Sequence, residues 1–233
     1  MIPDKAFYVN PANIEEDNFY LDPEESNHAT RVLRLTIGDE ITLLNGIGFG
    51  YHGLIKSVGK TVSGSIIETW EGLGENKIPI TLAPALIKRD RFELMLEKST
   101  ELGVTGIHPL VLDRCVKKDL NFKRSQKLII SAAKQSKRSR FPILEMPKNL
   151  ASALNVDAQI ICGRMGAEQS ISQLSLDSSR NVMVIIGPEG DFSDNEFALM
   201  EKANVLFYNL GKRRLRAETA ALNSLAVLNE ILN

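Results

Sequence analysis

The sequence predicts an α/β protein in which a strand-rich N-terminal domain precedes a second domain built on a parallel sheet. From residue 80 onward, apolar runs typical of buried strands alternate with helical patterns, and strand–helix–strand alternation favours parallel strands. Before that point, short strand-like segments are separated by glycine turns and accompanied by one helix, as in a small β-barrel. A glycine- and charge-rich stretch, 71–76, separates the two parts, so we expect domains at 1–72 and 73–233.

The composition argues against several classes of protein. The chain has 28 basic and 29 acidic residues among 233, so nucleic-acid binding would have to come from local patches. Cys115 and Cys162 lack metal or redox spacing, and the three histidines form no ligand cluster, so no metal is expected. No apolar run reaches the length of a membrane span, and the N-terminus lacks a signal-peptide pattern. We therefore expect a cytoplasmic protein that neither spans nor binds a membrane.

In the first domain the pattern predicts short strands and one helix. Asp22 as N-cap and Pro23 at the first helical position begin a helix over 24–33. The sequence from Gly48 to Gly53 fits a dinucleotide-binding fingerprint, but a strand follows it instead of a helix, so a hairpin is favoured. Gly59-Lys60-Thr61, which resembles the end of a P-loop, falls between two strands and is also expected to be a turn. The expected strands are 6–9, 19–21, 40–44, 51–58 and 62–70.

Two groups of basic residues are candidates for phosphate contact. His28, Arg31 and Arg34 share one helical face, although spacing alone favours a solvated polar face. Residues 114–140 hold ten Lys or Arg and a single acid, Asp119. Because no acidic partner is interleaved, we favour phosphate contact for this second group over a solvated face. Its members are Arg114, Lys117, Lys118, Lys123, Arg124, Lys127, Lys134, Lys137, Arg138 and Arg140.

Two predicted strands of the second domain end in glycine loops. The run 182–186 leads into Gly187-Pro188-Glu189-Gly190, and Ser193 and Glu196 then form a capping box for the next helix. The run 205–208 leads into Leu210-Gly211, a basic loop and a long closing helix. In an open α/β sheet, ligands bind at the carboxyl ends of strands, and glycine lets backbone groups approach a flat ligand such as adenine. Two ordinary strand-to-helix turns fit this local pattern equally well.

The remaining elements of the second domain follow the same alternation. The pattern predicts strands at 80–86, 106–112 and 158–162, a helix at 89–102 ended by Gly103, and a short helix at 150–154.

Several segments together resemble the RsmE family of ribosomal RNA uridine methyltransferases, of the SPOUT class. They are His28 to Asp39, Lys98 to Val104, the GPEGDFSDNE segment from Gly187, and LGKRRLRAETAAL from Leu210. The resemblance covers nearly the whole chain. It implies an N-terminal PUA-like RNA-binding β-barrel and a SPOUT α/β domain with a C-terminal trefoil knot, the knot and cofactor site lying at about 160–233. It also implies a homodimer that uses S-adenosylmethionine to methylate N3 of a uridine in 16S ribosomal RNA of the small subunit.

The chemistry of this reaction suggests the catalytic residues, and the resemblance suggests the binding residues. Arg216 is expected to stabilise the uridine anion formed when N3 loses its proton, with Arg138 as the second choice and Glu218 orienting Arg216. The cofactor loops would supply Gly163, Arg164, Gly187, Pro188, Glu189, Gly190, Leu210, Gly211, Leu215, Thr219 and Ala220. Contacts to RNA are expected from His28, Arg31, Arg34, Arg114, Lys117, Lys118, Arg138 and Arg140.

Two other functions remain open from the sequence. The first is a SPOUT methyltransferase that modifies another RNA position, which only substrate profiling would separate from the uridine reaction. The second is a non-catalytic RNA-binding protein whose glycine loops are structural, which would lack affinity for S-adenosylmethionine.

Overall fold

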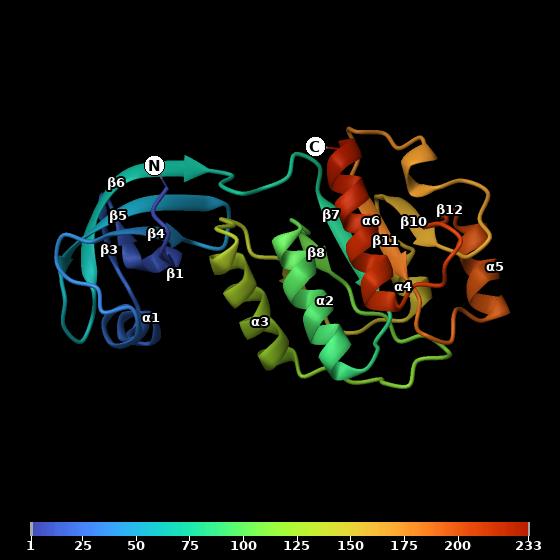
Figure 1. Cartoon of the computed structure of the whole chain (residues 1–233), viewed down its shortest axis with the longest axis horizontal. Helices are drawn as coiled ribbons and strands as arrows, with labels where there is room; N and C mark the ends of the chain where they lie inside the picture. The colour runs from blue at the N-terminus through green and yellow to red at the C-terminus, as the bar shows by residue number, and fades with distance from the viewer. Residues whose placement is uncertain (1, 233) are drawn as a thin grey trace. The chain divides into compact units, whose positions relative to one another are not determined.

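The computed structural model describes residues 2–232, and they form two compact units (Figure 1). The first unit comprises the chain to Glu75 together with Ile130–Phe141. The second comprises Asn76–Ile129 and the chain from Pro142 onward. No helix within residues 2–232 is long and apolar enough to cross a membrane.

The first unit is built on one curled, six-stranded sheet, seen in blue to teal in Figure 1. The strand order is β1-β4-β5-β6-β3-β2; β1 pairs in parallel with β4, and the other neighbours are antiparallel. Because β1 and β2 form its edges, the sheet is a half-barrel rather than a closed ring. Side chains such as Phe7, Phe19 and Leu43 fill its concave core. The bounds are β1 Ala6–Tyr8, β2 Ile14–Glu15, β3 Asn18–Tyr20, β4 Glu40–Leu44, β5 Phe49–Ser57 and β6 Ser63–Glu71, with a 3₁₀ turn, η1, at Pro11–Asn13.

Both nucleotide-binding patterns of the first unit lie in turns and strands, as expected. Gly48 has φ +119°, and strand β5 follows it directly. Gly59-Lys60-Thr61 connects β5 to β6. Neither segment opens a helix whose N-terminus could receive a phosphate.

The helix predicted at 24–33 is present but changes its geometry midway. Its first part is α1, Pro23–Asn27, and Asp22 caps it by accepting a 2.9 Å hydrogen bond from the backbone N–H of Glu25. The second part, η2 at His28–Val32, widens into a π-helical turn. Arg34 then adopts φ +54°, which ends the helical segment.

The segment 130–141 joins the first unit through ion pairs and backbone hydrogen bonds. Lys134 pairs with Glu25 at 2.5 Å, Lys137 with Asp4 at 3.0 Å, and Arg138 with Glu75 at 2.5 Å. Residues 139 and 141 donate backbone hydrogen bonds to the carbonyls of residues 73 and 46.

These pairs correct one inference from the sequence. The basic run contains a single acidic residue, Asp119, but the fold brings other acids to it from distant positions. Arg124 is a fourth example, because its guanidinium binds Glu93 through contacts of 2.6 and 2.9 Å. Lys134, Lys137, Arg138 and Arg124 therefore serve the fold, and fewer of the ten cations are available to RNA than the sequence indicates.

The second unit contains a parallel six-stranded sheet, as predicted. The strand order is β12-β10-β11-β7-β8-β9, and every neighbouring pair is parallel. Strand β11 is buried along its whole length, which explains its uninterrupted apolar sequence. The strand expected at 106–112 keeps ladder pairing only at its start. The bounds are β7 Ile80–Pro84, β8 Gly106–Ile107, β9 Ile143–Leu144, β10 Gln159–Gly163, β11 Val182–Ile186 and β12 Leu206–Tyr208.

Helices pack around this sheet. The C-terminal helix α6, Ala217–Leu232, contacts α2, Arg89–Glu101, as well as β7 and β11. The predicted end of α2 is confirmed, since Gly103 follows it with φ +87°. The other helices are α3 Phe122–Gln135, α4 Leu150–Ala153 and α5 Asp194–Lys202, with a 3₁₀ turn, η3, at Ile171–Gln173.

We expect a substitution of Gly64→Ala in β6 to destabilise the first unit. A Cβ atom there would overlap the carbonyl oxygen of Leu54 and lie 2.9 Å from the ring of Phe19. Overpacking of this kind costs about 1–3 kcal/mol. The matched control is Gly59→Ala, whose Cβ would have no neighbour closer than 4.0 Å. Urea unfolding of both variants measures the difference, and equal free energies of unfolding would contradict the close packing at Gly64.

Candidate functional site

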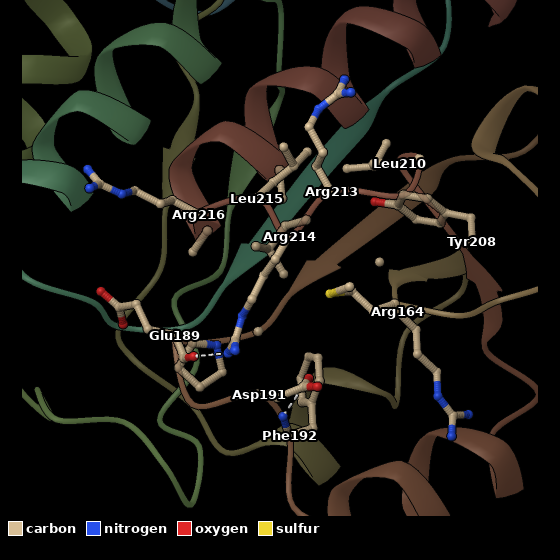
Figure 2. A pocket seen from close by; sticks show the side chains of 18 residues that line it. Arg164, Glu189, Asp191, Phe192, Tyr208, Leu210, Arg213, Arg214, Leu215 and Arg216 are labelled. Carbon is tan, nitrogen blue, oxygen red and sulfur yellow. Dashed lines mark hydrogen bonds between the residues drawn. The ribbon is translucent and has the colours of Figure 1, made fainter.

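A cavity of about 420 Å³ lies where three loops leave neighbouring parallel strands (Figure 2). Strands β12, β10 and β11 are adjacent in the sheet, so their carboxyl ends meet at one edge. The volume lies within the roughly 300–1,000 Å³ of small-molecule sites. The lining residues are Gly163, Arg164, Met165, Ile186, Gly187, Pro188, Glu189, Asp191, Phe192, Tyr208, Leu210, Gly211, Arg213, Arg214, Leu215, Arg216, Ala217 and Ala220.

Most of the predicted cofactor residues line this cavity. Gly190 and Thr219 do not, although Glu189, Asp191 and Ala220 beside them in the chain do. Asp191 and Phe192 also line the cavity and were not predicted, although their position directly after the GPEG segment was an available signal. Tyr208, the last residue of β12, is a further lining residue that was not predicted. The predicted role of each residue in binding a cofactor stays a prediction.

The loop after β11 requires glycine at its first position. A Cβ atom on Gly187 would lie 2.7 Å from the ring of Phe192, which is buried beneath the loop. The chain turns at Pro188, whose carbonyl accepts a 3.0 Å hydrogen bond from the N–H of Asp191. The Ser193–Glu196 capping box is confirmed, so helix α5 begins directly after this turn. Gly187 and Pro188 thus shape a tight loop that brings its backbone to the cavity.

Two arginines hold the same loop through its backbone carbonyls. The guanidinium of Arg214 donates to the carbonyl of Glu189 at 2.8 Å, and Arg114 donates to the carbonyl of Gly190 at 2.9 Å. Arg114 is exposed, so RNA can reach it. Its guanidinium is already engaged with the loop, so any contact with RNA is made by the same group that holds the loop. Hydrogen bonds from a charged donor are stronger than neutral ones. The GPEG loop is therefore fixed before any ligand binds.

Arg91 of α2 bridges two of the cavity loops. Its guanidinium lies 3.2 Å from the Glu189 carboxylate and 3.7 Å from that of Glu218, at the start of α6. Glu218 is only 7% exposed, and its Oε2 atom has no hydrogen-bond partner among the described residues. The partner of Glu218 is thus Arg91, and the expected pairing of Glu218 with Arg216 is not formed. No sequence signal linked Arg91 to these loops, which lie about a hundred residues further along the chain.

The loops after β10 and β12 are tied together by Asn209. Its side-chain amide donates to the carbonyls of Ala167 and Gln169 at 2.7 and 3.0 Å, and its Oδ1 accepts from the N–H of Gly211 at 3.1 Å. Gly211 has φ +96°, a conformation that favours glycine. The backbone N–H groups of Leu210 and Leu215 donate to no other described residue. They are therefore available to an acceptor on a ligand.

The floor of the cavity does not supply a base. Tyr208 is fully buried, and its hydroxyl shares a 2.6 Å hydrogen bond with the hydroxyl of Ser224. Burial raises the pKa of the Tyr208 phenol well above its usual value, so it stays protonated near neutral pH. Burial likewise raises the pKa of the nearby Cys162 thiol, which argues against a role as a nucleophile.

The basic side chains around the cavity differ in how they are used. Arg164 lines it with its backbone, while its guanidinium lies 4.4 Å from the ring centroid of Phe197 and points away from the loops (Figure 2). Arg216 lines the cavity, is exposed, and forms no ion pair with a described residue. Arg216 is therefore free to meet a negative charge brought by a ligand.

Arg138, the second choice for catalysis, is placed differently from what the sequence suggested. It is 1% exposed, it pairs with Glu75, and it does not line the cavity. A guanidinium buried in this way cannot reach RNA phosphates without breaking its pair. The other predicted RNA contacts are all exposed: His28, Arg31, Arg34, Arg114, Lys117, Lys118 and Arg140. Their binding to RNA stays a prediction.

Comparison with known proteins bears on this site. An RNA methyltransferase domain model matches residues 74–229, and an RNA methyltransferase PUA domain model matches residues 21–62. Ribosomal RNA small subunit methyltransferase E of Rickettsia conorii is 31% identical over 225 residues, which are 94% of this chain and 92% of the relative.

Solved structures are similar over the whole chain. Ribosomal RNA small subunit methyltransferase E from Neisseria gonorrhoeae, bound to S-adenosyl methionine, has a TM-score of 0.89 and 27% identity over 97% of each chain. A Legionella pneumophila protein in complex with the cofactor SAM has a TM-score of 0.86 and 31% identity, covering 99% of this chain and 98% of that one. The resemblance inferred from the motifs is thereby confirmed: the chain belongs to the ribosomal RNA small subunit methyltransferase E family.

Proposed function

We propose that this chain binds S-adenosylmethionine in the three-loop cavity and methylates N3 of a uridine in 16S ribosomal RNA. The observation that carries the proposal is the cavity itself, where glycine loops from three adjacent parallel strands meet beside the unpaired guanidinium of Arg216. Similar proteins with the same fold bind S-adenosylmethionine. The matching PUA model in the N-terminal part favours RNA as the methyl acceptor.

The residues present fit an adenosine-containing ligand. The backbone N–H groups of Leu210 and Leu215 offer hydrogen-bond donors, while Ile186, Leu215 and Ala220 supply apolar surface. Pockets of this kind combine apolar walls with a few placed polar groups. When bound, S-adenosylmethionine supplies a methyl group on a positively charged sulfur.

For the methyl transfer, the protein has to stabilise the negative charge on the base and align the reacting atoms. N3 of uracil carries a proton and becomes a good nucleophile only when that proton is lost. A fixed cation beside the base stabilises the uridine anion. The attraction between them grows as negative charge develops on the base, which lowers the activation barrier of methyl transfer. Arg213 and Arg216 both line the cavity, and neither forms an ion pair with a described residue. We assign this role to Arg216. The rigid loops would hold the reacting atoms in line.

The direct test is to incubate the protein with S-adenosylmethionine and either 16S ribosomal RNA or assembled small subunits. Nuclease digestion and mass spectrometry should reveal N3-methyluridine at one position. Methylation of a different base or of a ribose would favour another RNA methyltransferase activity. RNA binding without affinity for S-adenosylmethionine would favour the non-catalytic alternative.

We expect Arg216→Ala to lower kcat by about 10²–10³-fold, the effect of removing one group that stabilises a developing anion. Affinity for S-adenosylmethionine, measured by calorimetry, should change little, because the variant keeps the loop backbone. Lys212→Ala is the matched control, since Lys212 is an exposed cation of the same loop that does not line the cavity. Undiminished turnover of Arg216→Ala would remove Arg216 from the mechanism.

We expect Arg91→Met to weaken binding of S-adenosylmethionine by about tenfold, equivalent to about 1.4 kcal/mol. The substitution releases Glu189 and leaves the buried Glu218 without its cation, so two cavity loops lose their common anchor. Arg91→Lys should restore part of the affinity. Lys98→Met is the control on the same helix, because the only described residues with which Lys98 pairs are its neighbours Glu97 and Glu101. Equal affinities of the Met variants would show that Arg91 does not position the loops.

The proposal includes two architectural features that the family resemblance implies, a trefoil knot at about 160–233 and a homodimer. Light scattering at working concentration should give about twice the 25.8 kDa of the chain. A monomer that still binds S-adenosylmethionine would contradict the dimer but leave the cofactor site standing.

A further inference from the structure

A second cavity, of about 230 Å³, lies in the second unit between the first turns of α2 and α3. Its apolar walls come from Leu86, Phe92 and Leu120. The cavity is smaller than the roughly 300–1,000 Å³ of sites that hold drug-sized ligands. It therefore suits a single flat ring rather than a whole cofactor.

Ser125 gives this cavity a polar group that is not used within the protein. The residue lines the cavity and is only 3% exposed, yet its hydroxyl forms no hydrogen bond with any described residue. The hydroxyl oxygen is open to the cavity rather than sealed in the core, so it is available to a ligand. The side-chain amide of Asn121 also lines the cavity; its oxygen caps α3 by accepting from the N–H of Arg124 at 3.1 Å, and its NH₂ group is left to donate. A hydroxyl and an amide beside apolar walls match the hydrogen-bonding edge of a nucleobase.

The walls of this cavity are held in place before any ligand arrives. The guanidinium of Arg124, in α3, donates to both carboxylate oxygens of Glu93, in α2, at 2.6 and 2.9 Å. Arg89 donates to the same carboxylate at 2.8 Å. These hydrogen bonds lower the pKa of Glu93 to about 2. Two guanidinium groups thus fix one carboxylate. The charged side chains that line the cavity are Arg89, Glu93, Lys117 and Asp119, so their formal charges balance and the cavity offers both donors and acceptors to a ligand.

The second cavity opens at the same sheet edge as the first. Strand β7 lies next to β11, and the loop after β7 supplies Leu86. A single segment links the two cavities, because Arg114 binds the GPEG loop and Lys117 lines the second cavity. Lys118 is exposed on the same segment. A strand of RNA with its target base in the first cavity would follow these cations toward the second.

We propose that the second cavity receives the base of an unpaired RNA nucleotide near the methylated uridine. This inference rests on the proposed function, because it takes ribosomal RNA as the substrate. The base would pack against Phe92 and Leu120 and bond through its edge to Ser125 and Asn121, while Lys117 meets its phosphate. The cavity thereby contributes to the choice of RNA sequence, separately from methyl transfer.

The test fills the cavity and measures RNA affinity. Ser125→Met should raise the Kd for a 16S ribosomal RNA fragment containing the methylated uridine by about 5- to 150-fold, the range seen on losing one stacked base. Ser131→Met places the same side chain at an exposed position of the same helix and should leave the Kd unchanged. Fluorescence anisotropy gives both values, and affinity for S-adenosylmethionine checks that each variant is folded.

The milder variant Ser125→Ala decides the question if Ser125→Met fails to bind S-adenosylmethionine. It removes the hydroxyl without filling the cavity and should weaken RNA binding several-fold. RNA affinity equal to that of the unaltered protein would overturn the inference even if methylation proceeds. Weaker RNA binding by the Ser125 variants would support it even if the unaltered protein transfers no methyl group, so failure of the site and failure of the proposed function are distinguishable.

Discussion

The parallel alignment of β10, β11 and β12 is the constraint on which the site depends. Parallel ladder pairing brings the carboxyl ends of these three strands to one edge, so loops from residues 163, 187 and 210 must meet there. The strands are held together by their burial. Val184 and Ile185 of β11 are fully buried, and each residue of β11 contributes apolar surface to the core beneath the cavity. A polar residue in β11 would weaken the sheet and separate the loops at the same time.

Positive charge serves two purposes in this chain. Some cations are tied to the fold, as Arg138 is to Glu75 and Arg91 to Glu189 and Glu218. Others, such as Arg216 and Lys117, face cavities with no ion pair to a described residue. The division follows burial, since a buried guanidinium without a carboxylate would cost several kcal/mol. A near-zero net charge is thus compatible with a surface that attracts RNA locally.

The sequence was sufficient for the features set by local patterns. Alternation of apolar runs predicted the parallel sheet, Ser193 and Glu196 predicted the start of α5, and Gly103 predicted the end of α2. The glycine loops were placed correctly because they follow strands directly. The predictions that were wrong concerned contacts between residues that are distant in the chain. Nothing near Arg138 in the chain indicates that Glu75 lies beside it, and nothing near Glu218 indicates Arg91. The strand expected at 106–112 is shorter because only its first two residues pair in the ladder.

The discontinuous first unit has a consequence for synthesis of the chain. Glu25 and Glu75 meet their cations, Lys134 and Arg138, only after residue 138 has been added. Burial raises the pKa of Glu25, and Lys134 offsets that cost. A nascent chain that has just reached Glu75 therefore carries both carboxylates without their counter-ions. These ion pairs of the N-terminal unit can form only after the ribosome has added more than sixty further residues. A fragment that ends at residue 75 would lack Lys134 and Arg138 and could not form them.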